Sequence, residues 1–267
     1  MDGVLIAGIL NVTPDSFSDG GHYWMTEQAV AHGMTMLEHG ADWLDVGGES
    51  TRPGSRPVSA EEEARRVVPV IEALHERRPD AILSIDTSKS SVAGQALRAG
   101  AAVVNDVSGL RDPNMAATVV EYDAELVIMH MRGTPDTMQQ DTHYDKLLAE
   151  IDAALLCGIE RAMAAGMPKE RIILDPGIGF GKALEDNAVL IQHLQRWQLG
   201  GHRVMIGASR KSFIGQLTNE PDPQQRLAGS LGAALAAAEN GADILRVHDV
   251  KETRDALTVF HACRRTV

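Results

Sequence analysis

Eight short aliphatic runs alternate with longer amphipathic stretches along the whole chain of 267 residues. The runs are rich in Val, Ile and Leu, as is typical of strands buried on both faces, and the stretches place apolar residues at helical spacing. This alternation predicts a parallel sheet covered by helices. The expected strands are 4–10, 43–46, 82–85, 102–104, 125–129, 171–174, 203–206 and 244–247.

The expected helices begin and end at local signals. Thr26 is the candidate N-cap of the first helix, which we expect to end at Gly40. Ser59 and Glu62 form a capping box for the second helix, and Pro69 inside that helix predicts a bend because proline removes a backbone donor. The remaining helices are expected at about 88–99, from about 113, and at 145–165, 184–196, 211–217, 223–240 and 251–264.

Three joints between a helix and the next strand share a Gly-Ala pair, at 40–42, 100–102 and 241–243. Glycine takes the left-handed conformation that ends a helix, and the strand follows within about two residues. One βα unit repeats about every 33 residues, which favours an α/β fold of the (β/α)8 TIM-barrel type, a single domain over 1–267. An open doubly wound sheet would normally show a G-x-G-x-x-G loop after the first strand, and none is present there.

The composition narrows the classes of partner. A formal net charge of −12 argues against nucleic acid, since phosphate binding along a duplex needs a broad basic face. No apolar run approaches the roughly 18 residues of a membrane helix, so we expect no membrane partner and a cytoplasmic location. Cys157 and Cys263 have no spacing that suggests a disulfide framework or a zinc site, which fits a reducing compartment.

Polar residues follow all eight expected strands, where barrel enzymes carry their catalytic groups. They are Asn11; Asp45, Glu49, Thr51 and Arg52; Asp86; Asn105 and Asp106; His130; Asp175; Ser209, Arg210 and Lys211; and Arg246 and His248. We interpret Asp45 as structural, serving nearby backbone N–H groups. Asp106 and Ser108 could either stabilise a turn or belong to the site. His130 could be either a buried core histidine or a hydrogen-bond donor at the rim.

Cations gather after the seventh and eighth strands, where barrels commonly bind phosphate. Lys211 and Arg246, with Arg210 as a further candidate, predict an anion-binding pole there. Opposite this pole we expect Asp86, Asn105 and Asp175 to accept hydrogen bonds from the amino and ring N–H edge of a heterocycle, because a buried carboxylate needs donors to stay ionised.

The segment 11–21 follows the first strand and is expected to have two roles. Its first residue is expected to be a metal ligand, and the residues after it are expected to form a lid over the site. Asn11 supplies a neutral oxygen, enough for a Mg²⁺ that is also held by phosphate oxygens of a substrate and by water. Asp15, Phe17 and Asp19 lie in a stretch closed by two glycines that suits neither a strand nor a hairpin. Such a stretch predicts a mobile loop over a site.

With these residues the chain resembles the dihydropteroate synthases of the pterin-binding barrel family. The matching segments occur in the family's order and cover almost the whole chain: 11–21, 48–54, 85–87, 105–108, 129–131, 175–182, 209–212 and 246–249. One departure is that the first strand begins almost at the N-terminus, which leaves little room for the hairpin that often caps the barrel floor in this family.

The resemblance implies condensation of 6-hydroxymethyl-7,8-dihydropterin diphosphate with 4-aminobenzoate, a Mg²⁺ cofactor and a homodimer. By position it assigns the pterin to Asp86, Asn105, Met129, Asp175 and Lys211. It assigns the diphosphate to Asn11, Arg246 and His248, with Asn11 also on the metal. It assigns the aminobenzoate to Thr51, Arg52, Pro53, Phe180, Lys211 and Ser212, beneath the loops 15–21 and 50–59. The catalytic set would be Asp86, Asp175, Lys211, Arg246 and His248.

Two other functions stay open at this point. A methyltetrahydrofolate-dependent methyltransferase uses the same pterin-binding barrel but needs neither the diphosphate cations nor the pocket at Thr51, Arg52 and Pro53. A non-catalytic pterin-binding paralogue would be expected to have lost residues of the loops or of the anion site, and none of these is missing from the sequence. Formation of dihydropteroate from the two substrates discriminates between the three.

Overall fold

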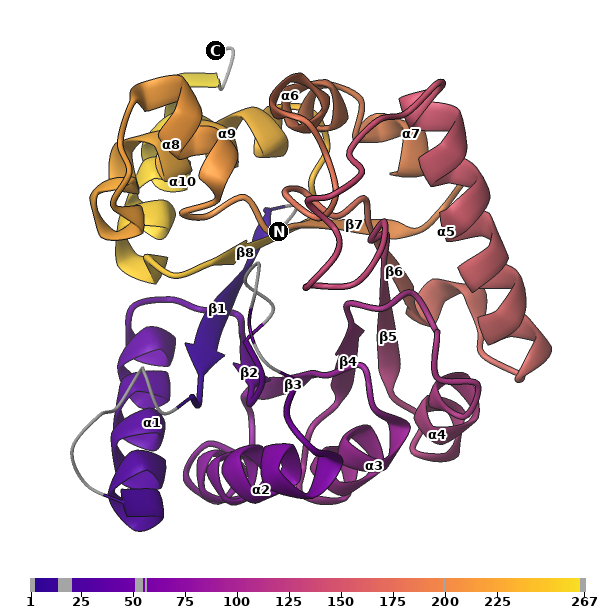
Figure 1. The fold of residues 1–267 in the computed structure, drawn as a ribbon. Helices are drawn as coiled ribbons and strands as arrows, with labels where there is room; N and C mark the ends of the chain where they lie inside the picture. Colours follow the sequence, from indigo (N-terminus) through magenta and orange to yellow (C-terminus); the bar gives the residue numbers. More distant parts are fainter. Residues whose placement is uncertain (1–2, 14–20, 51–54, 56, 199, 265–267) are drawn as a thin grey trace.

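Eight parallel strands close into a barrel in chain order, with β8 paired to β1 (Figure 1). The computed structural model describes residues 3–13, 21–50, 55, 57–198 and 200–264. The strands are β1 (Leu5–Asn11), β2 (Trp43–Gly47), β3 (Ile82–Asp86), β4 (Val103–Asp106), β5 (Glu125–Met129), β6 (Ile172–Asp175), β7 (Arg203–Ile206) and β8 (Ile244–Val247). The predicted (β/α)8 barrel is confirmed.

Ten α-helices in the described part of the chain surround the barrel (Figure 1). They are α1 (Gly21–Glu38), α2 (Ala60–Arg77), α3 (Ser90–Arg98), α4 (Met115–Glu121), α5 (Leu147–Ala164), α6 (Leu184–Gln192), α7 (Gln195–Gln198), α8 (Ser212–Thr218), α9 (Leu227–Glu239) and α10 (Val250–Arg264). Short 3₁₀ helices, η2 (Lys169–Arg171) and η3 (Pro223–Gln225), precede β6 and α9. The main apolar core packs these helices against the outer face of the strands.

Several predicted boundaries are wrong. Thr26 lies inside α1 and does not cap it, because the helix already begins at Gly21 and nothing between the two residues breaks it. The stretch predicted as one helix over 184–196 is divided into α6 and α7 at His193, which leaves helical geometry with a φ of −117°. Ser59 does cap α2, accepting a hydrogen bond from the Glu62 N–H at 3.2 Å, and Pro69 lies inside that helix.

Four strands extend past their predicted ends into the polar residues that follow them. Asn11, Asp86, Asp106 and Asp175 are the last residues of β1, β3, β4 and β6 rather than the first residues of loops. Their backbones therefore belong to the ladder of the barrel, which holds each side chain more rigidly than a loop would.

The interior of the barrel changes from apolar to polar along the strands. A buried cluster near the amino ends consists of Ala7, Trp43, Val103, Val127, Ile173, Met205 and Ile244. Since every second residue of a strand faces the same side, the next inward positions are Asp45 on β2, Asn105 on β4 and Arg246 on β8. The apolar cluster closes the floor, and the polar layer above it leads to the carboxyl end.

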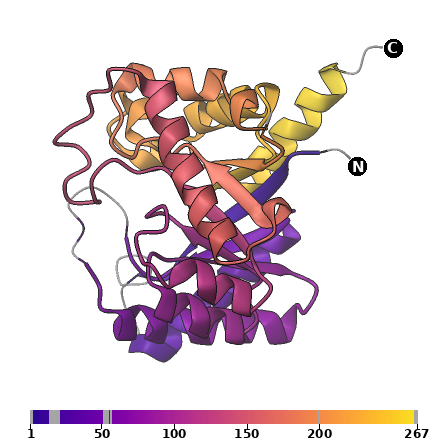
Figure 2. The same cartoon turned by 90° about the vertical axis from the view of Figure 1, so that its right-hand side faces the viewer.

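The connection between β5 and α5 projects from one face of the barrel, whereas the first and last described residues lie toward the opposite face (Figure 2). No helix in the described ranges is long and apolar enough to cross a membrane. Cys157 and Cys263 are both free thiols on the surface.

Gly177, just after β6, provides a test of how tightly this end of the barrel is packed. Its φ of +75° is left-handed, and a Cβ there would lie 1.9 Å from the His130 carbonyl oxygen. We expect Gly177→Ala to lower the free energy of unfolding by at least about 2 kcal/mol, since strain and overlap act together. Gly232→Ala is the control, because a Cβ there meets nothing within 4 Å. Equal urea midpoints for the two variants would contradict the expectation.

Candidate active site

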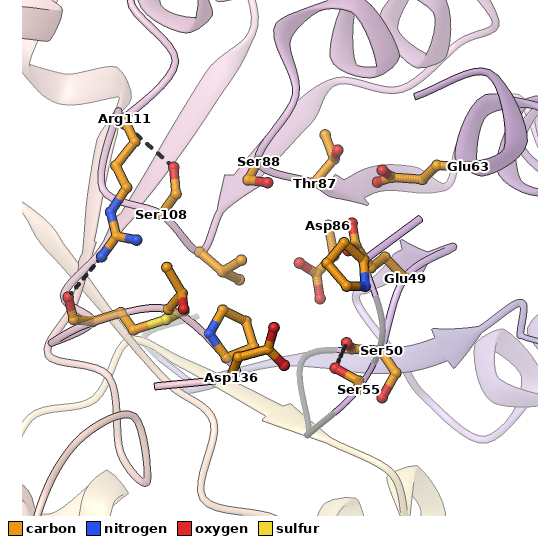
Figure 3. Close-up of a pocket in the computed structure, with 15 residues that line it drawn as sticks. Glu49, Ser50, Ser55, Glu63, Asp86, Thr87, Ser88, Ser108, Arg111 and Asp136 are labelled. Carbon is orange, nitrogen blue, oxygen red and sulfur yellow. Dashed lines mark hydrogen bonds between the residues drawn. The ribbon is translucent and has the colours of Figure 1, made fainter. Parts of the chain in front are cut away.

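A cavity of ≈ 350 Å³ opens at the carboxyl ends of β2 to β5, within the loops that follow them. Figure 3 shows Glu49, Glu63 and Asp86 on one side of it and Arg111 with Ser108 on the other. Arg111 also donates to the Met131 carbonyl oxygen at 3.3 Å, which ties the loop after β4 to the loop after β5. The cavity is therefore acidic on the side where it meets the barrel interior at Asp86.

Arg246 crosses the barrel interior from β8. Its Nε donates to Asp45 Oδ2 at 2.5 Å and its Nη2 donates to Asp86 Oδ2 at 2.6 Å. The prediction of two opposite poles is wrong in this respect, because Arg246 from the cationic side is paired directly with Asp86 from the acidic side. An arginine side chain is long enough to reach past β1 to β2 and β3, and the buried carboxylates attract it.

Asp45 is the centre of this network, and among the described residues its carboxylate accepts from side chains rather than from the backbone N–H groups that were predicted. Its Oδ1 accepts from Ser84 Oγ at 2.6 Å, and its Oδ2 accepts from Asn105 Nδ2 at 2.9 Å as well as from Arg246. An ionised carboxylate only accepts, so the Asn105 amide must turn its nitrogen toward Asp45. Asn105 Oδ1 is then left buried with no hydrogen-bond partner among the described residues. The site thus presents an unsatisfied acceptor to a ligand.

Burial shifts the ionisation of the charged groups around this network. Desolvation raises the pKa of Asp86 to about 7, although Arg246 opposes the shift. Desolvation also raises the pKa of Asp175 to about 6. The Gly177 N–H donates to Asp175 Oδ1 at 2.7 Å, and this hydrogen bond lowers the pKa and so limits the rise. Desolvation and the neighbouring Arg246 lower the pKa of Lys211 to about 8. These three predicted site residues are therefore poised to change charge near neutral pH.

Apolar side chains form one wall of the site. Met129, at the end of β5, and Phe180, in the loop after β6, belong to a buried cluster with Val107, Met131 and Met138. Lys211 Nζ lies 3.7 Å from the centroid of the Phe180 ring, within cation–π distance. Ser212, the first residue of α8, follows Lys211 and is exposed.

His248 is neutral in this arrangement. Desolvation, together with Arg210 and Arg246, lowers the pKa of His248 to about 3. Ser209 Oγ accepts from the His248 backbone N–H and lies 3.0 Å from Nδ1, so the hydroxyl hydrogen is available to Nδ1 and the ring proton sits on Nε2. His248 thus offers an anion a neutral N–H donor and no positive charge.

Arg210 is not part of the anion-binding pole. Its guanidinium pairs with Asp249, with Nε 3.1 Å from Oδ2 and Nη2 2.5 Å from Oδ1. The residue has a φ of +60°, which lies in the left-handed region.

Two of the ambiguous rim residues have structural partners. Asp106 accepts from the N–H groups of Ser108 and Leu110, each at 2.8 Å, which is turn chemistry. His130 is buried, and its Nδ1 lies 2.9 Å from Lys182 Nζ. Lys182 was missed as a site residue, although it ends the segment 175–182 that carries the family resemblance. It also donates to the Phe180 carbonyl oxygen at 3.0 Å, and burial lowers its pKa to about 7.

Asn11 and Asp86 supply oxygens to one gap above Gly47. A Cβ on Gly47 would lie 3.7 Å from Asn11 Oδ1 and 3.6 Å from Asp86 Oδ2, so both oxygens border the space that the glycine leaves open. Over the described ranges there is no group of three or more His, Cys, Asp or Glu residues that could hold a metal ion. A neutral amide oxygen suits a hard cation such as Mg²⁺ when substrate oxygens and water complete the shell.

Part of the predicted site lies outside the described residues. These are Asp15, Phe17 and Asp19 of the predicted lid and Thr51, Arg52 and Pro53 of the predicted aminobenzoate pocket.

Comparison with known proteins gives the family. Residues 7–248 match the family model described as "Pterin binding enzyme", and this range runs from within β1 to the residue after β8. The chain is therefore a pterin-binding barrel enzyme.

Individual relatives give a narrower assignment. The dihydropteroate synthase of Escherichia coli (strain K12) is 46% identical over 257 residues, which cover 96% of this chain and 90% of that protein. The dihydropteroate synthase of Xanthomonas albilineans with 4-aminobenzoic acid has a TM-score of 0.93 and 48% identity, covering 100% of this chain and 95% of that one. The same enzyme in complex with 7,8-dihydropteroate has a TM-score of 0.90 and 46% identity, with the same coverage. The chain belongs to the dihydropteroate synthases, the transferases of folate biosynthesis. This membership argues against the two alternatives, the methyltransferase and the non-catalytic paralogue.

Asp45 can be tested as the residue that orients Asn105 and Arg246. We expect Asp45→Ala to weaken binding of a dihydropterin ligand by about tenfold or more, because Asn105 and Arg246, two of the three donors to Asp45, lose their acceptor at a cost of roughly 1–3 kcal/mol. Asp45→Asn should lose less, since its amide oxygen can still face both donors while its nitrogen faces Ser84. Calorimetry on folded protein gives the affinities, and wild-type affinity in Asp45→Ala would contradict the role.

The shifted pKa values predict a bell-shaped pH dependence of kcat/KM. Asp86 and Asp175, with pKa values of about 7 and about 6, gain protons as the pH falls and then accept fewer hydrogen bonds. Lys211, with a pKa of about 8, loses its charge as the pH rises. Activity should therefore be highest between about pH 7 and pH 8 and should fall on both sides. A flat profile from about pH 5 to pH 9 would contradict this assignment.

Proposed function

We propose that this enzyme condenses 6-hydroxymethyl-7,8-dihydropterin diphosphate with 4-aminobenzoate to give 7,8-dihydropteroate and diphosphate. The observation that carries the proposal is the convergence of Asp86, Asn105, Asp175, Lys211 and Arg246 at the carboxyl end of one closed barrel. The Xanthomonas albilineans structures, whose descriptions include 4-aminobenzoic acid and 7,8-dihydropteroate, support both the acceptor substrate and the product.

The pterin is held by acceptors and an apolar wall. Asn105 Oδ1, which has no partner in the described part of the protein, accepts from one N–H of the ring edge, and Asp86 and Asp175 accept from others. Met129 lies against the flat ring. Lys211, positioned by Phe180 and close to both carboxylates, donates to a ring acceptor. Each buried polar group then gains the partner that burial demands.

The diphosphate is held next to Asp86 by Asn11, Arg246 and His248. Arg246 uses one Nε and one Nη2 hydrogen for Asp45 and Asp86, which leaves its remaining N–H groups for the leaving oxygens. His248 donates from Nε2 as a neutral group. Asn11 Oδ1 would hold Mg²⁺ with phosphate oxygens and water, and the bound ion would supply positive charge that neutralises the departing diphosphate.

The residues of the barrel favour cleavage of the carbon–oxygen bond before the amine attacks. Diphosphate leaves with the bonding electron pair, and the electron-rich dihydropterin shares the positive charge of the remaining methylene group. Asp86 and Asp175, when ionised, stabilise this charge. The arylamine nitrogen then forms the new carbon–nitrogen bond and releases one proton. Closure of the loops 15–21 and 50–59 would exclude water, which competes for the same carbon.

The homodimer and the cytoplasmic location belong to the proposal as well. Apolar side chains on the outer helices, such as Leu156 and Met163 on α5, are about half exposed and available to a second copy. Sedimentation velocity gives the oligomeric state directly.

The reaction itself provides the test. Purified protein supplied with the two substrates and Mg²⁺ should form 7,8-dihydropteroate, and chelation of the metal should abolish the product. Arg246→Lys should lower kcat/KM by about 10²-fold or more, since lysine cannot hold two carboxylates and an anion together. Absence of product from the wild-type protein with Mg²⁺ would overturn the proposed function.

A further inference from the structure

Lys182 is a buried cation that the proposed mechanism does not use. It lies in the loop 176–183 after β6 and is 5% exposed. Its Nζ donates to His130 Nδ1 at 2.9 Å, to the His130 carbonyl oxygen at 3.3 Å and to the Phe180 carbonyl oxygen at 3.0 Å. An ammonium has three hydrogens, which match these three acceptors. None of the three acceptors carries a negative charge, so hydrogen-bond geometry fixes the place of this cation.

The contacts of Lys182 fasten the loop 176–183 to the end of β5. His130 is the residue that follows β5, and Phe180 lies inside the loop itself. The loop is also held from α5's side, where the Tyr144 hydroxyl donates to the Gly181 carbonyl oxygen at 2.9 Å. Lys182 therefore closes the loop on itself and joins two neighbouring strand ends through one ammonium.

The same loop packs against Lys211. The centroid of the Phe180 ring lies 3.7 Å from Lys211 Nζ, and a Cβ on Gly179 would lie 3.1 Å from Lys211 Cδ. The loop thus contacts both the stem and the ammonium of a side chain that is flexible by nature. Because the Phe180 carbonyl oxygen is bound to Lys182, the place of the ring depends on Lys182.

The Lys182 ammonium also contributes to the charge around Asp175. Burial raises the pKa of the Asp175 carboxyl, whereas the Gly177 N–H and the cations Lys211, Lys182 and Arg246 lower it. The groups that face Lys182 itself are Asp175, Lys211, Asp186, Arg132 and the neutral His130. Removal of the Lys182 charge should therefore raise the pKa of Asp175 further.

We propose that Lys182 is a positioning residue of the reaction, which fastens the loop 176–183 to β5 and, through Phe180, holds Lys211 in place. The inference rests on the proposed function in that Lys211 and Asp175 are the groups that bind substrate. Without the ammonium, the carbonyl oxygens of His130 and Phe180 lose their shared donor and the loop separates from β5. The ring then leaves Lys211, whose ammonium loses its fixed direction.

Kinetics test whether Lys182 acts through Phe180. Lys182→Met should lower kcat/KM for the pterin diphosphate by about tenfold or more, and Lys182→Arg, which keeps the charge and the donors, should recover most of the loss. In a Phe180→Leu background the same Lys182→Met change should cost less than about threefold, because the ring that Lys182 places is already absent. Equal losses in the two backgrounds would overturn the proposal.

The titration of Asp175 provides a signature that a general loss of packing would not produce. It can be followed by NMR of carboxyl-labelled aspartate, with the signal assigned by its absence in Asp175→Asn. The midpoint should move to higher pH in Lys182→Met, because a cation that favours the carboxylate is gone, and should stay in place in Lys182→Arg. An unchanged midpoint in Lys182→Met would show that the ammonium does not act on the site and would overturn the proposal.

Lys251→Met is the matched control. Lys251 forms an ion pair with Asp255 one turn along α10, both residues are more than half exposed, and neither takes part in the site. The same chemical change there should leave kcat/KM and the Asp175 midpoint at the wild-type level. If Lys182→Met does not yield folded protein, Lys182→Gln keeps a donor and removes the charge, and it should raise the Asp175 midpoint.

Hydrogen exchange tests the loop without any turnover. The Phe180 amide, which donates to the Gly177 carbonyl oxygen at 3.1 Å, should exchange about tenfold faster in Lys182→Met than in the wild type and should be unchanged in Lys251→Met. Unchanged exchange at Phe180 in Lys182→Met would overturn the role of Lys182 even in an active enzyme. Failure of the wild type to form dihydropteroate would overturn the proposed function, while exchange and titration would still decide whether Lys182 holds the loop.

Discussion

Closure of the barrel, through the pairing of β8 with β1, is the constraint on which the site depends. An open sheet would leave β8 and β3 at a distance, whereas closure places their inward-facing residues across a narrow interior. Arg246 can therefore reach Asp45 and Asp86 with one guanidinium. The apolar cluster around Trp43 fills the barrel beneath this network, so the charges are confined to the carboxyl end.

Confinement of these charges costs free energy, and the protein reduces the cost by pairing them internally. Asp45 satisfies Ser84, Asn105 and Arg246 together, and its carboxylate in turn is satisfied by them. The pairing is incomplete, because Asn105 Oδ1 keeps no partner in the described structure and burial raises the pKa values of Asp86 and Asp175. A substrate with several N–H donors and an anionic leaving group supplies the partners that are lacking. Binding of such a ligand is favoured because it gives hydrogen-bond partners to buried polar groups that otherwise lack them.

The two substrates depend on different kinds of support. Four of the residues assigned to the pterin, Asp86, Asn105, Met129 and Asp175, lie within the last two positions of strands, so the barrel ladder positions them. Among the residues assigned to the aminobenzoate that the structure describes, Phe180 lies in the loop after β6 and Ser212 begins α8, so neither belongs to the ladder. Rigid support for the pterin fits the proposed reaction, in which diphosphate leaves before the amine attacks.

The sequence by itself determined the number and order of the strands, the barrel class and the polar identity of the strand ends. These features follow from the spacing of apolar residues, which repeats every two residues in strands and every 3.6 residues in helices and can be recognised within a few neighbouring positions. Only the tertiary structure decided how the polar residues pair. Asp45 accepts from a residue 39 positions away and from another 201 positions away, and no local pattern records such a contact. For the same reason the sequence misplaced Arg210, whose partner Asp249 lies beyond the next strand, and missed Lys182, whose contact with His130 exists only in the folded barrel.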